Sequence, residues 1–131
     1  MKRAYEFLKK AGAFYVATME GETPKVRPFG FVMIFRERLY FCTNNQKDVY
    51  RQLQKNPRIE ICACTGEEWV RIKGKAVFDR DMDVKKQVFV EDPGMNALYK
   101  PEDEIFEVFY LSEASAVFAD MRGKSETEVF V

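Results

Sequence analysis

The chain has 131 residues, the length of a single domain with one core, and its 21 basic side chains balance its 21 acidic ones. Because the formal net charge is zero, no overall electrostatic field attracts nucleic acid or an anionic membrane surface. The sequence contains no histidine, which excludes hydrolase mechanisms that pair serine or cysteine with histidine.

The N-terminal third predicts a short helix followed by a hairpin. Apolar residues at helical spacing predict a helix over residues 1–11, without the uninterrupted apolar run of a signal peptide or a membrane span. Strands are expected over residues 13–19 and 25–35, the second interrupted by Pro28 and Gly30. Three cysteines in a chain with no export signal indicate reduced thiols and a cytoplasmic location.

A second helix is expected after the next strand, which covers residues 39–43. Asn45 is its predicted N-cap, with Asp48 three residues later as a capping partner, and the helix stops before Pro57. Patterns of apolar and β-forming residues predict secondary structure in most of the remaining chain. No element is assigned to the tail over residues 122–131. These further elements are strands over residues 59–65, 69–78, 105–111 and 115–121 and a helix over residues 81–91.

The order of these elements predicts a mainly β fold, one domain over residues 1–131. Strands follow one another as in a meander, helices occupy connections, and no strand–helix–strand repeat is present, which indicates a small antiparallel barrel with peripheral helices. Several strands are apolar on both faces, and only one face can fill the barrel. We therefore expect a homodimer in which a second copy covers the other face.

Two cations are predicted to lie close together, Arg27 on a strand and Lys47 at the start of a helix. A guanidinium, an ammonium and the free N–H groups of a helix start form a site for a phosphate dianion. Gly30, without a Cβ, lets a ligand approach the strand backbone. Both cations could also be ordinary surface charges, and the Thr43–Asn45 corner could serve only as a helix cap.

The other chemically active side chains suggest no separate site. Cys62 and Cys64 share one face of a strand, but zinc would need a carboxylate as fourth ligand, so we expect no metal and treat all three cysteines as small buried apolar residues. A basic stripe of Arg71, Lys73 and Lys75 is a solvated face or attracts an anionic substrate.

Five segments in order carry a family resemblance: V-R-P-F-G-F, L-Y-F-C-T-N-N, a lysine that opens a helix, K-N-P-R and W-V-R-I-K-G-K-A. Together they resemble the pyridoxamine 5′-phosphate oxidase-related flavoproteins over roughly residues 5–80. The resemblance implies an antiparallel split β-barrel of six to seven strands. It also implies a homodimer that binds FMN in a groove between the subunits.

The resemblance also implies the residues that contact FMN. Arg27 and Lys47 would hold the phosphate, the backbone around Gly30 would run beside the isoalloxazine, and Thr43 would hydrogen-bond the phosphate or the ribityl chain. Trp69 takes the place of a flavin-contacting glutamine of the oxidase, and is expected to lie either beside the flavin or in the dimer interface. The full predicted set is Arg27, Pro28, Phe29, Gly30, Phe31, Val32, Cys42, Thr43, Asn44, Lys47 and Trp69.

The implied function is oxidoreduction by FMN, which passes electrons from a reduced nicotinamide to a flavin, quinone or nitroaromatic acceptor and requires no catalytic side chain. The Arg-x-His pattern of the oxidase is absent, so we do not expect pyridoxamine 5′-phosphate oxidase activity. The alternatives are a non-enzymatic module that binds, stores or senses FMN or heme, and a ligand-free structural dimer.

Overall fold

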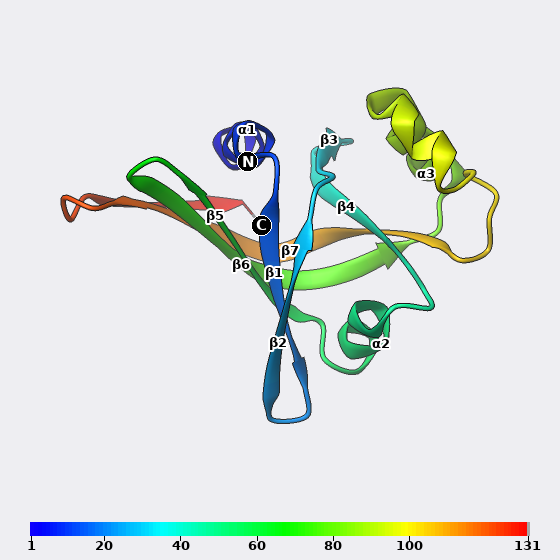
Figure 1. Ribbon diagram of the computed structural model, residues 1–131, viewed down its shortest axis with the longest axis horizontal. Coiled ribbons are helices and arrows are strands. Elements are labelled where there is room, and N and C mark those ends of the chain that lie inside the picture. The colour runs from blue at the N-terminus through cyan, green and yellow to red at the C-terminus, as the bar shows by residue number, and fades with distance from the viewer. Residues whose placement is uncertain (131) are drawn as a thin grey trace.

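Eight strands form one antiparallel sheet that curls around a core without closing (Figure 1), as seen in a computed structural model that describes residues 1–130. The predicted mainly β, split-barrel fold is confirmed, with eight strands where six to seven were expected. The strands are β1 (Phe14–Glu20), β2 (Thr23–Phe29), β3 (Met33–Phe35), β4 (Arg38–Asn44), β5 (Arg58–Thr65), β6 (Glu68–Asp79), β7 (Phe106–Asp120) and β8 (Ser125–Phe130). The helices are α1 (Lys2–Ala11), α2 (Asp48–Lys55), α3 (Met82–Glu91) and the 3₁₀ helix η1 (Pro93–Ala97).

The long strand β7 organises the sheet, whose order is β2-β1-β5-β6-β7-β4-β3. One edge of β7 pairs with β6, while the other edge pairs first with β4 and then with β8. The prediction of two strands over residues 105–111 and 115–121 was therefore wrong. The chain bends at Glu113, where φ is 50°, and the pairing with β6 shifts between Lys73 and Lys75, but the pairing resumes beyond this bulge.

The predicted strand over residues 25–35 is two strands, β2 and β3, which lie at opposite ends of the sheet order. Residues 30–32 carry the chain from one edge of the sheet to the other. Apolar residues on both sides of this segment hid the break, since the sequence pattern does not distinguish a crossing from a strand. This crossing marks the opening in the barrel.

Aromatic side chains account for much of the core inside the curled sheet. The Phe41 and Phe109 rings stack at 5.5 Å, and Phe14 meets Phe41 edge-on at 5.7 Å. Helix α1 contributes the fully buried Ala4 and Leu8 to the same cluster. A second cluster lies between α3 and the β3–β4 side of the sheet, where Figure 1 shows α3 standing apart from α1 and α2. None of the helices in residues 1–130 has the length and apolar character needed to cross a membrane.

The cysteines depart from expectation. Ile59, Ile61 and Ala63 of β5 are buried, so strict alternation turns Cys62 and Cys64 outward, and both are exposed. The prediction of three buried cysteines was wrong for these two, while Cys42 is partly buried. Among residues 1–130 no cluster of three or more potential metal ligands occurs.

Candidate functional site

A cavity of about 400 Å³ lies at the opening of the barrel, between the end of β2, β4, the start of α2 and the segment after α3. Most of the predicted site residues line it. They are Arg27, Pro28, Phe29, Gly30, Phe31, Cys42, Thr43 and Lys47. Segments separated by 20 residues in sequence are thus brought together at one place, as the motifs predicted.

Three predicted residues do not line this cavity. Val32 is buried in the core, and Asn44 lies beside the cavity, where its Nδ2 donates to the hydroxyl of Tyr99 at 2.6 Å. Trp69 is half-buried on β6 and pairs in register with Cys64, so it belongs to a different part of the same chain. Contact between Trp69 and a cofactor therefore stays a prediction that requires a second copy.

The guanidinium of Arg27 is held in a fixed orientation at the cavity wall. Its Nη1 donates to the Val16 carbonyl at 3.1 Å and to the Thr18 hydroxyl at 2.7 Å, and its Nη2 donates to Gln52 Oε1 at 2.7 Å. Burial lowers the pKa of Arg27, although a guanidinium remains charged at any physiological pH. Because these partners use only part of its five-donor fork, the remaining N–H groups are available to an anion.

Lys47 stands at the start of α2, where it is itself the N-cap residue, and no side chain caps this helix. The prediction of Asn45 as N-cap was wrong, because its Nδ2 donates to the Glu104 carbonyl and to Glu107 Oε2 at 2.8 and 2.9 Å. Lys47 is exposed, and within residues 1–130 it forms no salt bridge. An uncapped helix start and an unpaired ammonium are therefore presented to the cavity together.

Two further observations fit a phosphate-bearing planar ligand. The Thr43 hydroxyl is buried and has no hydrogen-bond partner in the described part of the chain, which is costly unless a ligand or water satisfies it. No heavy atom lies within 4 Å of where a Cβ on Gly30 would sit. The cavity thus combines donors suited to an anion with open space beside the backbone at Gly30, just after β2, which is suited to a flat ring.

The opposite wall of the cavity was missed from the sequence. It consists of Asp92, Met95, Leu98 and Tyr99, which lie within η1 or next to its ends. Burial, with a smaller contribution from the charge of Asp92, raises the pKa of Cys42 to about 12, so this thiol stays protonated. The Asp-Pro-Gly turn is visible in the sequence, but no spacing relates the residues after it to Arg27 or Lys47.

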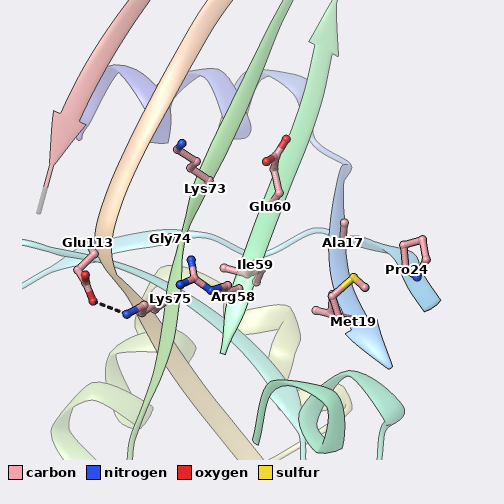
Figure 2. Close-up of a pocket in the computed structure, with 11 residues that line it drawn as sticks. Ala17, Met19, Pro24, Arg58, Ile59, Glu60, Lys73, Gly74, Lys75 and Glu113 are labelled. Carbon is pink, nitrogen blue, oxygen red and sulfur yellow. Dashed lines mark ion pairs between the residues drawn. The ribbon is translucent and has the colours of Figure 1, made fainter. Parts of the chain in front are cut away.

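A second cavity, of about 430 Å³, lies on the outer face of β1, β5 and β6 (Figure 2). It contains part of the basic stripe, but acidic side chains offset it: Lys75 forms a salt bridge with Glu113 at 3.0 Å, and Glu60 pairs in register with Lys73. Figure 2 shows Arg58 beside Lys75 on the neighbouring strand. This cavity contains charges of both signs and no helix start, so the cavity at Arg27 is the better site for an anionic ligand.

The open barrel, with a cation-lined cavity at its opening, defines a protein of the split-barrel class. The sequence model described as pyridoxamine 5′-phosphate oxidase matches residues 1–120, and the chain belongs to this family. A search of curated proteins finds no match.

Solved structures support the same fold. A NimC/NimA family protein from Clostridium acetobutylicum is 37% identical, with a TM-score of 0.95, and the match covers 98% of this chain and 91% of that one. General stress protein 26 from Bacillus anthracis is 13% identical, with a TM-score of 0.74 and 97% of both chains covered. A pyridoxamine 5′-phosphate oxidase-related, FMN binding protein from Nostoc punctiforme is 15% identical, with a TM-score of 0.66 and coverage of 99% and 94%.

Proposed function

We propose that the cavity binds FMN, with the phosphate between Arg27, Lys47 and the start of α2, and the ring system along the backbone at Gly30. The observation that carries this proposal is that one cavity gathers two cations, a buried unpaired hydroxyl and, at Gly30 just after β2, backbone with no side chain over it. Charge-assisted hydrogen bonds contribute roughly 1.5–3 kcal/mol each, enough to anchor one end of the cofactor.

We further propose that the protein is an oxidoreductase that uses FMN to pass electrons from a reduced nicotinamide to a small acceptor such as a flavin, quinone or nitroaromatic. FMN supplies the hydride and electron chemistry when it is bound. The chain binds and orients the cofactor and restricts the access of water, and needs no catalytic base, which agrees with a sequence that lacks histidine. In this proposal the acceptor contacts Met95 and Leu98, which line the far wall of the cavity.

The active form proposed is a homodimer in which the outer face of the sheet meets a second copy. Tyr15, Val26 and Val129 expose apolar area, and the second cavity contains charges of both signs that can pair across a two-fold axis. Trp69 points to this same face, because it pairs in register with the exposed Cys64. Such a dimer offers a route for Trp69 of the second copy to reach the cofactor.

Absorption spectroscopy and calorimetry on the purified protein test the proposal. We expect a flavin spectrum, either on purification or after addition of FMN, and consumption of reduced nicotinamide that depends on an added acceptor. A colourless protein that takes up no added FMN would rule the function out. Bound FMN without any nicotinamide oxidation would instead favour a storage or sensing role, and a Soret band would indicate heme.

A further inference from the structure

A fully buried carboxylate, Glu107 on β7, stands behind the phosphate side of the cavity. Its partner in the register of β4 and β7 is Thr43, which lines the cavity. Directly opposed residues of an antiparallel pair point to the same face, so the two side chains are neighbours. The Thr43 hydroxyl and Glu107 Oε1 are the two buried side-chain polar atoms in residues 1–130 that have no hydrogen-bond partner.

The other oxygen of Glu107 is used to hold the turn between β4 and α2. Glu107 Oε2 accepts from Asn45 Nδ2 at 2.9 Å and from Arg80 Nη2 at 3.3 Å. Asn45 is attached twice more to the segment before β7, through its Nδ2 to the Glu104 carbonyl at 2.8 Å and through its backbone N–H to the Ile105 carbonyl at 2.9 Å. Three hydrogen bonds therefore fix a turn that ends two residues later at Lys47.

A buried charge is tolerated only where its interactions compensate for desolvation. The salt bridge from Arg80 offsets part of the negative charge of Glu107, and the remainder, next to Thr43, repels a phosphate bound in the cavity. The carboxylate therefore contributes to anion binding through the part of the chain that it holds in place. The group that it holds is the turn that aims Lys47 and the start of α2 at the cavity.

We propose that Glu107 and Asn45 are positioning residues that set the preference of this site for a flavin bearing a phosphate over the same flavin without one. The inference rests on the proposed FMN function and deepens it. The two residues act through Lys47 and α2 and do not themselves touch the cofactor.

Titrations of the full chain with FMN and with riboflavin test the proposal, since only FMN carries the phosphate. Asn45→Ala removes the attachment at a partly buried position, and we expect it to weaken FMN binding about tenfold while riboflavin affinity changes less than about twofold. The matched control is Asn56→Ala at the other end of α2, where Asn56 Oδ1 accepts from the Arg58 N–H, and it should leave both affinities unchanged. Melting temperatures establish that each variant is folded.

Glu107→Gln tests the proposal through the direction in which the preference for FMN over riboflavin changes. Glutamine keeps an acceptor for Asn45 but loses the charge, so the hydrogen bond weakens, and we expect the preference for FMN over riboflavin to fall about threefold. Repulsion without positioning would instead make the preference rise, and that result would overturn the proposal. The double variant Asn45→Ala/Glu107→Gln should lose no more preference than Asn45→Ala alone, because both changes act on the same hydrogen bond.

The remaining outcomes separate this inference from the proposed function. A wild-type protein that binds neither flavin overturns both. A wild-type protein that prefers FMN, with Asn45→Ala and Glu107→Gln keeping the same preference, overturns only the positioning role. Equal weakening of FMN and riboflavin in Asn45→Ala would indicate general loosening of the cavity and would also overturn it.

Discussion

Replacement of Gly30 separates cofactor binding from stability. Gly30 has no positive φ, and no heavy atom lies within 4 Å of the position of its absent Cβ, so the first side-chain atom of Gly30→Val meets open space. Restricting the unfolded chain stabilises such a variant by roughly 0.4–1 kcal/mol. A ring in contact with the backbone at Gly30 would have to lie within ~4 Å of it, in the space that the valine methyl groups occupy. We therefore expect FMN affinity to fall by about a hundredfold, a loss of ~2.7 kcal/mol.

Flavin fluorescence titration and thermal unfolding measure the two effects on the same sample. Gly74→Ala is the opposite control, because its Cβ would lie 3.0 Å from the Ser112 carbonyl oxygen and 3.1 Å from the Ala114 Cβ. That variant should lose about 1–3 kcal/mol of stability from overpacking, while the folded protein keeps its FMN affinity. Wild-type FMN affinity in Gly30→Val would refute the reasoning, because it would show that no ring lies along the backbone at Gly30.

Three other predictions follow from the same geometry. Arg27→Gln should weaken FMN about 10- to 100-fold and leave riboflavin nearly unchanged in calorimetry, and an equal loss for both ligands would contradict a phosphate role. Thr43→Val removes a buried unpaired hydroxyl, so urea unfolding should show equal stability or a gain of up to about 1 kcal/mol, while FMN affinity falls about tenfold. Unchanged FMN affinity would show that the hydroxyl does not contact the cofactor. Burial raises the pKa of the Cys42 thiol from 9.0 to about 12, so the thiol of the unfolded chain loses its proton at lower pH than the thiol of the folded chain. The contribution of the protonated Cys42 to folding stability is therefore lost as pH rises from about 9 through about 12. Across that pH range the melting temperature of Cys42→Ala should fall less steeply with pH than that of the wild type. An equal fall in both proteins would contradict this assignment.

Regular alternation made part of the fold predictable from the sequence. In β5 the buried residues alternate with exposed ones along the whole strand, and β6 repeats this pattern through Val70 and Ile72. The tail over residues 122–131 could not be assigned because most of β8 is polar and exposed, and its pairing with β7 comes from backbone hydrogen bonds that no side-chain pattern encodes. The same limit applies to β7, whose bulge at Glu113 reads as a break between two strands.

The candidate site was predictable where a motif supplied it and not elsewhere. Arg27, Gly30 and Lys47 lie in segments whose order carries the family pattern, and the structure places them around one cavity. Asn45 has the residue type of a helix cap, but tertiary hydrogen bonds to the segment before β7 take its side chain instead. The wall formed around η1 depends on how the chain returns after α3, which local sequence does not determine.

The opening of the barrel and the position of the cavity have one physical cause. β2 and β3 stand at the two ends of the strand order, each with one neighbour, and the crossing at residues 30–32 joins them. An edge strand has unpaired backbone N–H and C=O groups, which proteins must cover, and the edge strand β2 contains Pro28, which has no N–H to donate. The polar rim of a flat cofactor can bond to such groups in place of a missing strand. The barrel would then remain open because, in the proposed complex, a ligand occupies the position that a further strand would otherwise fill.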